Sequence, residues 1–285
     1  MSEVANAVAL AKQVVVQAAG VKQVWHVWGE VNGKPLLLFH GGSGSWTHWV
    51  RCVEALSEYR AVWALDLPGF GDSELPAGAQ DVTDLLDPIH EGMQQLFTQG
   101  PVDVAGFSFG AMTAGLLAAQ HPNCFAQVLM LGTPGLGLFD GPPPNIRGFT
   151  AGMSDAEREA VHRHNLLSFM LKHEATVDAQ TLQLQANNVA RDRLKRRRLA
   201  RTDVVLRASD AWKCPVHLAF GEADQLYPGR LHEIPGLFAS GVISSFEIIE
   251  DAGHWAMYER PQAVIDWISS KLDECSNSNP RSPAT

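Results

Sequence analysis

One stretch of the sequence, residues 101–122, limits the possible folds more than any other. It reads PVDVAGFSFGAMTAGLLAAQHP. Its first part is short, apolar and β-prone, whereas its last part is rich in Ala and Leu and predicts a helix. A strand that turns so abruptly into a helix forces strained backbone geometry, and Gly106 and Gly110 remove the Cβ atoms that would otherwise clash. The sequence therefore predicts a sharp strand–turn–helix unit with Ser108 at its tip.

Ser108 stands at the start of the predicted helix, so we expect its hydroxyl to be exposed and the neighbouring N–H groups to point outward. Residues 106–110 fit the pattern G-x-S-x-G, in which the central serine can be a nucleophile. The same pattern is common in glycine-rich turns that have no catalytic role. The strand before it and the helix after it favour the nucleophile, provided that the chain also supplies a base, an acid and donors for an oxyanion.

Short apolar runs and helical patterns alternate on both sides of this unit. Residues 13–19 and 22–30 predict an antiparallel hairpin at a sheet edge. Further strands are expected at residues 36–39, 61–65, 102–105, 126–131, 216–220 and 243–250, and helices at residues 82–98 and from Pro261 to near Leu272. This alternation predicts an α/β fold, with a mostly parallel eight-stranded sheet and helices on both of its faces.

The strand pattern stops at Gly132 and resumes at Pro215. Residues 154–206, within this gap, look purely helical, and an inserted lid over Ser108 is the natural use for such a segment. We therefore expect a core of residues 1–133 and 211–275, an inserted all-helical cap of residues 134–210, and a disordered tail of residues 276–285.

Two groups of cap residues each allow two interpretations. The basic group could bind an anion or could be a solvated helix face that pairs with acidic residues elsewhere, and we expect the latter. It comprises Arg191, Arg193, Lys195, Arg196, Arg197, Arg198 and Arg201. The apolar group could line a pocket or form the cap's own core, and the core is favoured. It comprises Phe149, Met153, Leu166, Phe169 and Met170.

Composition and charge narrow the class of protein. A content of 46% hydrophobic and 19% charged residues excludes a mainly disordered or fibrous chain. The net charge of −9 argues against a nucleic-acid partner, and no apolar run approaches the ~20 residues that would span a membrane. The N-terminus lacks the basic region of a signal peptide, and the oligomeric state is left open, a homodimer included.

The cysteines indicate the compartment. The four of them, Cys52, Cys124, Cys214 and Cys275, have neither metal-binding nor redox spacing. We expect free thiols in a reducing compartment, which suggests a cytoplasmic location.

A second glycine-rich stretch, residues 40–46, follows the predicted strand at residues 36–39. It lacks the Lys and the spacing of a phosphate-binding loop. It could bring a backbone N–H close to a ligand oxygen, or it could be a plain strand-to-helix turn. We expect His40 to anchor this loop, and Asp66 to anchor the Pro- and Gly-rich turn that follows it rather than to act as a catalytic acid.

Candidates for the acid and the base follow later strands. Asp224 comes after the strand at residues 216–220, at the sheet edge where Ser108 is expected, and Asp251 and Asp140 are its competitors. Among the 11 histidines, only His254 has both a preceding glycine and a position after the last strand. The chain order would then be Ser, Asp, His.

These motifs together strongly resemble the α/β-hydrolase superfamily, over about residues 13–274. They are HGG at 40–42, DLPGFGDS at 66–73, GFSFG at 106–110, G-x-x-D-x-x-x-P at 221–228 and GHW…ERP at 253–261. Each motif alone is weak, but five in order at similar separations are specific. The resemblance selects Asp224 as the acid because its surroundings match the family's pattern.

The resemblance implies a role for each residue. Ser108 would attack a carbonyl carbon, His254 would take its proton and return it to the leaving group, and Asp224 would orient the imidazole. The backbone N–H groups of Phe109 and Gly42 would hold the oxyanion. Substrate contacts are expected from Gly41, Ser43 and Trp255. No metal or organic cofactor is implied, and the partner would be a small-molecule substrate.

The choice among hydrolases rests on a few positions. A nucleophilic serine argues against epoxide hydrolases and haloalkane dehalogenases, which carry a carboxylate there. Proline iminopeptidases are similar at HGG but have Pro-Gly next, where this chain has Ser43-Gly44, and Trp in place of Phe109.

Within the superfamily the chain looks most like the meta-cleavage-product C–C hydrolases, at LGTPGLG (residues 131–137) and at Trp255. It departs from them at Gln185, where those enzymes carry an Arg for the dienoate carboxylate. The leading expectation is therefore hydrolysis of a carboxylic ester or lactone of a small, largely apolar substrate. C–C bond hydrolysis is the first alternative, and a hydrolase-fold ligand receptor with little turnover is the second.

Overall fold

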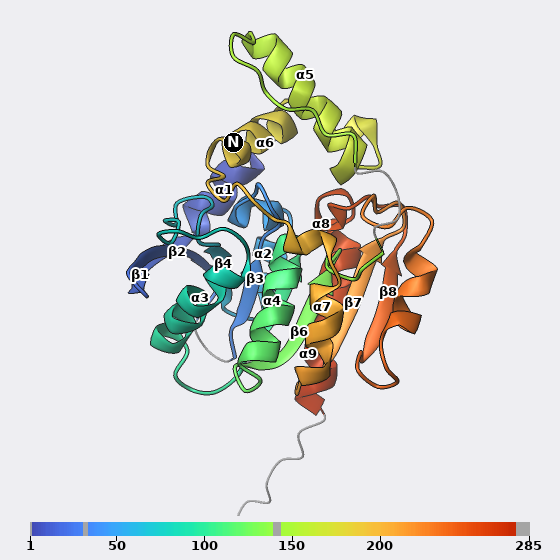
Figure 1. The fold of residues 1–285 in the computed structure, drawn as a ribbon. Coiled ribbons are helices and arrows are strands. Elements are labelled where there is room, and N and C mark those ends of the chain that lie inside the picture. The colour runs from blue at the N-terminus through green and yellow to red at the C-terminus, as the bar shows by residue number, and fades with distance from the viewer. Residues whose placement is uncertain (1, 31–33, 139–143, 278–285) are drawn as a thin grey trace, which may run out of the picture.

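The computed structural model describes residues 2–30, 34–138 and 144–277, and its strands form one eight-stranded sheet (Figure 1). The strand order is β1-β2-β4-β3-β5-β6-β7-β8. The strands are β1 Lys12–Ala18, β2 Val21–Trp28, β3 Leu36–Phe39, β4 Val62–Asp66, β5 Val102–Phe107, β6 Phe125–Leu131, β7 Val216–Gly221 and β8 Ser245–Ile249. Pairing is antiparallel for β1–β2 and β2–β4 and parallel from β4 through β8, which confirms the predicted mostly parallel sheet.

The predicted edge hairpin is present, and it turns through Ala19 and Gly20, both with positive φ (49° and 73°). Such a turn matches the twist of the two strands. β1 is mostly exposed, as an edge strand can be, whereas all four residues of β3 are buried in the middle of the sheet.

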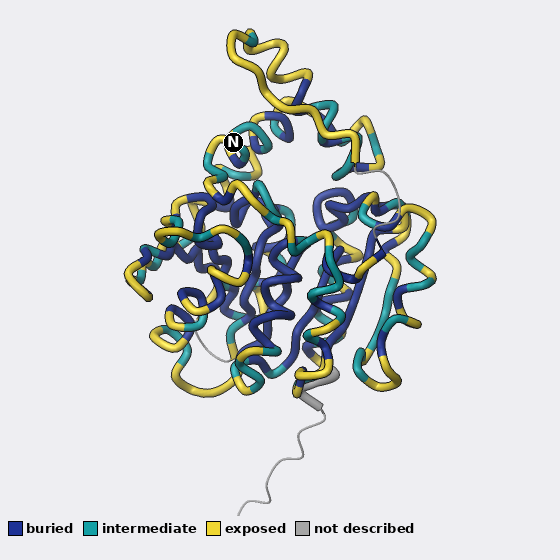
Figure 2. Tube along the Cα trace, viewed as in Figure 1, coloured by how far each residue is buried: buried dark blue, intermediate teal, exposed yellow. Residues whose placement is uncertain are grey.

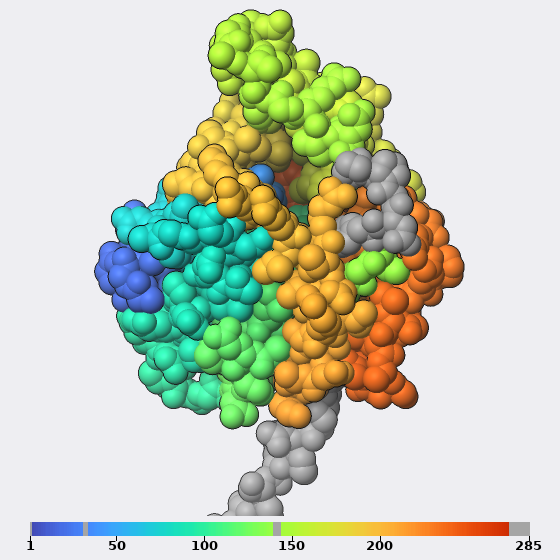
Figure 3. Space-filling model, in the orientation of Figure 1, coloured from blue at the N-terminus to red at the C-terminus, as the bar shows by residue number. Residues whose placement is uncertain are grey.

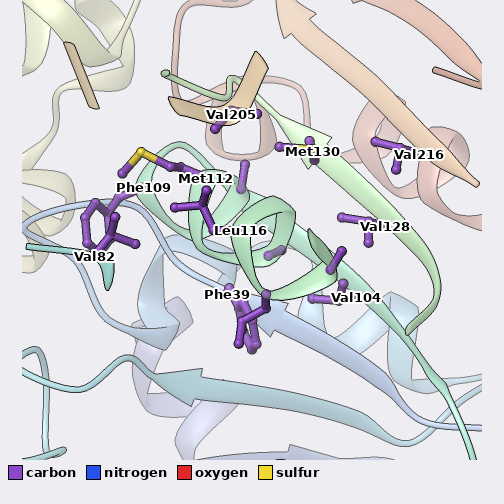
Figure 4. Close-up of a cluster of buried hydrophobic side chains, with 14 of the residues drawn as sticks. Phe39, Val82, Val104, Phe109, Met112, Leu116, Val128, Met130, Val205 and Val216 are labelled. Carbon is purple, nitrogen blue, oxygen red and sulfur yellow. The ribbon is translucent and has the colours of Figure 1, made fainter. Parts of the chain in front are cut away.

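Helices cover both faces of the sheet, and alternate strand residues serve the two layers. Leu37 and Phe39 of β3 join the hydrophobic cluster under α3 (Thr83–Leu96) and α4 (Phe109–Gln120), part of which Figure 4 shows. Leu36 and Leu38 join the cluster on the other face. Its helices are α2 Val53–Ser57, α8 Ala256–Glu259 and α9 Pro261–Asn277, with α1 Glu3–Leu10 at its rim.

The connection from β6 to β7 holds no strand within its described residues. It contains α5 Asp155–Asn165, a π-helical turn Leu166–Met170, α6 Ala179–Ala190 and α7 Val204–Ala208, with 3-10 turns at Glu174–Thr176, Leu199–Arg201 and Ser209–Ala211. α5 and α6 stand above the sheet, and α5 is mostly exposed (Figures 1 and 2). We call residues 144–201 the cap segment. α7 instead packs on α4 in the core, and the division at residues 134 and 210 stays a prediction.

The expectation that residues 154–206 are purely helical is wrong for residues 191–198, which form no helix. The reason is a set of tertiary hydrogen bonds. The N–H of Arg193 donates to the carbonyl of Gly69 at 2.9 Å, and its guanidinium donates to carbonyls of the 70–73 turn. These bonds outweigh the segment's helix propensity. The basic group is therefore not a helix face, although Arg191 does pair with the acidic Asp72.

Two further expectations concern the chain's end and its cysteines. α9 extends to Asn277, beyond the predicted end near Leu272, and the rest of the predicted tail lies outside the described residues. Cys52 and Cys124 are free thiols, as expected. Within the described ranges, no helix combines the length and the apolar character that crossing a bilayer requires.

The packing of α4 predicts different changes in stability for two glycine substitutions. Alanine normally stabilises a helix interior by about 1 kcal/mol relative to glycine. A Cβ on Gly110, however, would lie 2.5 Å from the carbonyl oxygens of both Phe39 and His40. We expect Gly110→Ala to lower the free energy of unfolding by at least about 2 kcal/mol in urea titrations, because β3 must move.

Gly115→Ala is the matched control in the same helix. Its Cβ would meet first the flexible end of Met130, at 2.9 Å, so we expect a change within about 1 kcal/mol. Equal losses in the two variants would contradict this account of the packing.

Candidate active site

The turn between β5 and α4 places Ser108 in the geometry that the sequence predicts. Ser108 has φ 51° and ψ −116°, a backbone conformation that is energetically unfavourable for a residue with a side chain. A Cβ on Gly106 would lie 2.5 Å from the carbonyl oxygen of residue 110, so this close approach of β5 to α4 requires glycine at position 106. The Ser108 N–H donates to the carbonyl of Leu131 at 2.8 Å, which ties the turn to β6.

Three predicted residues, from loops far apart in sequence, form one hydrogen-bonded chain. His254 Nε2 lies 2.8 Å from Ser108 Oγ, and His254 Nδ1 lies 2.9 and 2.8 Å from the two carboxylate oxygens of Asp224. His254 and Asp224 are each 1% exposed. A proton on Nδ1 leaves Nε2 free to accept the proton of Ser108, which is what a serine nucleophile requires.

The two competing acids take no part in this series of hydrogen bonds. Asp251 forms ion pairs with Lys172 and Arg260 at the surface, and it contacts His173 Nε2. Asp140 lies outside the described residues.

The expected oxyanion donors lie beside the serine. Phe109 is the first residue of α4, and an N–H in the first turn of a helix has no acceptor within the helix. Gly42, from the loop after β3, lines the same pocket as Ser108 and Phe109. The two residues come from different elements that meet at one cavity, and their N–H groups stay the predicted oxyanion donors.

A cavity of about 370 Å³ opens at Ser108, and a hollow is visible below α5 in Figure 3. Its apolar lining includes Ile146, Phe149, Phe169, Met170, Val189 and Leu226, and its polar lining includes Arg147, Asn165, Gln185 and Arg197. Phe169 also packs on the His254 ring, with centroids 4.7 Å apart. The expectation that the apolar cap residues form only the cap's own core is thus wrong for Phe149, Phe169 and Met170, because the cap folds over the serine. Leu166 is fully buried, as expected for core.

The expected substrate contacts differ in their placement. Gly41 and Ser43 line the cavity. Trp255 is fully buried instead: its indole N–H donates to the carbonyl of His48 at 2.9 Å, and its ring stacks on Tyr258. The structure therefore places Trp255 beneath the site as a support, and its cavity-facing role is not seen.

Two anchors behave as predicted. The N–H of Leu67 donates to His40 Nε2 at 2.9 Å. Asp66 accepts the N–H groups of Trp46 and Asp72, at 2.8 and 2.9 Å. Among the described residues, His26, Asp66 and Asp72 are the one group with ligand atoms close enough for a metal ion, but both Asp66 oxygens already accept these N–H groups.

Two residues of the site were missed in the sequence. His48 is buried, and its Nδ1 accepts the N–H of Gly41 at 3.1 Å. Glu259 is buried and accepts the N–H groups of Gly253, Lys172 and His173, so it joins the loop before His254 to the cap segment. The ERP motif contains Glu259, but only the fold shows which N–H groups it meets.

Comparisons with known proteins identify the family and the shared fold. The sequence profile described as "Alpha/beta hydrolase family" matches residues 36–267. The chain is 34% identical over 122 residues to a 2-hydroxymuconate semialdehyde hydrolase of Pseudomonas sp. (strain CF600), a match that covers 42% of each protein. It is 25% identical over 252 residues to Lipase 3 of Moraxella sp. (strain TA144), covering 85% of this chain and 78% of the lipase.

A solved structure of a thermophilic esterase from Thermogutta terrifontis superposes with a TM-score of 0.67 at 21% identity. The superposition covers 93% of this chain and 99% of the esterase, and at this identity it shows a shared fold.

The buried histidines of the loop after β3 predict a loss of stability in acid. Burial, stronger than the opposing effect of Asp66, holds the pKa of His40 below its ordinary 6.5, and burial followed by repulsion from His40 and His254 holds the pKa of His48 well below it. Below pH 6.5 the unfolded chain therefore binds protons that the folded chain does not. We expect the free energy of unfolding to fall by up to about 1.4 kcal/mol per pH unit for each histidine as the pH drops from 6.5.

Urea titrations between pH 7.5 and 5 measure this slope. His48→Asn keeps an acceptor near Nδ1 but cannot titrate, so its slope should be smaller than that of the wild type. Equal slopes in the two proteins would show that His48 does not contribute.

Proposed function

The chain belongs to the alpha/beta hydrolase family, and we propose that it is a serine hydrolase that cleaves a carboxylic ester or lactone of a small, largely apolar substrate. One observation carries the proposal: the hydrogen-bonded chain from Asp224 through His254 ends at Ser108, on the wall of a mostly apolar cavity. Nucleophile, base and orienting acid are thus within hydrogen-bond reach before any substrate binds.

The first half of the reaction would form an acyl-enzyme. Ser108 Oγ attacks the carbonyl carbon while His254 Nε2 takes its proton, and Asp224 stabilises the resulting imidazolium. The negative charge that develops on the carbonyl oxygen is held by the N–H groups of Phe109 and Gly42. The tetrahedral intermediate then collapses, and His254 gives the proton to the departing alkoxide oxygen.

The second half would use water in place of the serine. His254 takes a proton from the water as it attacks the acyl carbon, and then returns a proton to Ser108 Oγ. The acid product leaves and the enzyme regains its starting state. The apolar residues of the cap segment would bind the substrate's hydrocarbon part and limit access of bulk water.

C–C bond hydrolysis of the meta-cleavage-product type is the second candidate, favoured by the local identity to the 2-hydroxymuconate semialdehyde hydrolase. The cavity weakens it at one position. Gln185 lines the cavity and offers an amide, at the position where the family resemblance implies a guanidinium for the substrate carboxylate; the guanidinium groups of Arg147 and Arg197 line the cavity at other positions. We therefore place ester or lactone hydrolysis first.

Turnover of short-chain p-nitrophenyl esters by the wild type and by Ser108→Ala tests the proposal. We expect the wild type to turn over the esters and the mutant rate to be at least about a thousandfold lower, because the residual groups bind but cannot attack. A mutant that keeps its activity would exclude Ser108 as the nucleophile.

A vinylogous 1,5-diketone acid, assayed beside the esters, separates the two candidates. Cleavage of this compound without ester turnover would replace ester hydrolysis by C–C hydrolysis. Binding of either compound with less than one turnover per minute would instead favour a receptor.

A further inference from the structure

The loop that carries Gly42 is held from above by the cap segment. Ser43 Oγ donates to a carboxylate oxygen of Asp192 at 2.7 Å, and Arg197 Nη1 donates to Ser43 Oγ at 3.2 Å. Arg197 Nη2 pairs with the same Asp192 oxygen. The Asp192 side chain is only 10% exposed, so Ser43, Asp192 and Arg197 form a partly buried cluster joined by charge-assisted hydrogen bonds.

The backbone at Ser43 needs this support. Its φ is 51°, in the left-handed region that is costly for a residue with a side chain. Such a conformation persists only when its surroundings hold it in place. The φ and ψ of Ser43 orient the peptide groups on both sides of Ser43, and the first of these is joined directly to Gly42. A change in the Ser43 backbone would therefore also displace Gly42 and its N–H.

Two more contacts bind the same loop to the cap segment. Arg197 lies so close to Gly42 that a Cβ there would be 2.7 Å from its Nη1. Further along the loop, Asn188 of α6 accepts from Ser45 Oγ at 2.8 Å and donates to Thr47 Oγ1 at 3.0 Å. The cap segment therefore holds the loop at Gly42 and Ser43 and again at Ser45 and Thr47, directly after the predicted oxyanion donor.

We infer that Asp192 and Arg197 are positioning residues, which act through Ser43 to aim the Gly42 N–H at the oxyanion. The inference rests on the proposed function and adds that the cap segment completes the catalytic site as well as covering it. A hydrogen-bond donor that stabilises a charge present only in the transition state raises kcat and leaves substrate binding nearly unchanged. Loss of the cluster should therefore lower kcat rather than raise KM.

The first test is the kinetics of Asp192→Ala with p-nitrophenyl acetate. We expect kcat to fall about 10- to 100-fold, less than for complete removal of a donor, with KM changed less than about threefold. Asp192→Asn should recover much of the loss, since its amide oxygen can still accept from Ser43. Arg191→Ala is the control at the neighbouring residue: it removes a charge of the opposite sign, from an exposed pair with Asp72, and should keep wild-type kinetics.

A second readout separates positioning from a general loss of structure. A trifluoromethyl ketone forms a tetrahedral adduct with a nucleophilic serine, and its Ki should rise in parallel with the fall in kcat/KM. Ser43→Gly accepts the left-handed backbone without strain but loses the hydroxyl, so it should also lower kcat if the cluster matters. It decides the question if Asp192→Ala does not fold.

The outcomes distinguish this inference from the proposed function. Wild-type kcat in both Asp192→Ala and Ser43→Gly, or a loss confined to KM, would overturn the positioning role alone. Absence of Ser108-dependent turnover in the wild type would overturn the proposed function itself.

Discussion

The close approach of α4 to β3 and β5 is the constraint on which the site depends. Helix backbone meets strand backbone at Gly106 and Gly110, at distances that no Cβ would permit. This packing holds Ser108 in its strained conformation, which places its hydroxyl above the end of the sheet. A layer of buried side chains on α4, β5 and β6 supports the turn from below (Figure 4).

The parallel sheet brings the remaining groups to the serine. Carboxyl ends of parallel strands meet at one edge, so the loops after β3, β7 and β8 deliver Gly42, Asp224 and His254 to the same place. The cap segment then adds contacts from the other side. The N–H of Trp255 donates to the carbonyl of Met170 at 2.7 Å, so the loop that bears His254 is held by both the core and the cap.

The sheet, the turn at Ser108 and the partners of that serine could all be predicted from the sequence. The strands depend on apolar runs, the turn on two glycines, and the positions of Asp224 and His254 on their place just after a strand. The choice of Asp224 over Asp251 came from the resemblance of its surroundings to the family's pattern. What could not be predicted depends on contacts between distant segments. Arg193 stops the helix only because the 69–73 turn lies beside it, and His48 meets Gly41 only because the loop folds back.

The cap shows the same limit. Phe169 and Leu166 are both apolar and three residues apart, yet one packs on His254 and the other lies in the core. No helical periodicity distinguishes the two, because the π-helical turn of residues 166–170 changes which side chains of the segment face the cavity. The lining of the cavity, and with it the substrate, is therefore a property of the folded cap.

The measurement that tests the central claim most directly is the intact mass of the protein after reaction with diethyl p-nitrophenyl phosphate, followed by peptide mapping. The account predicts one diethylphosphoryl group per chain, carried by Ser108, and no label on the Ser108→Ala variant. A stable adduct on another residue, or an unlabelled wild-type protein, would contradict the assignment of Ser108 as an activated nucleophile.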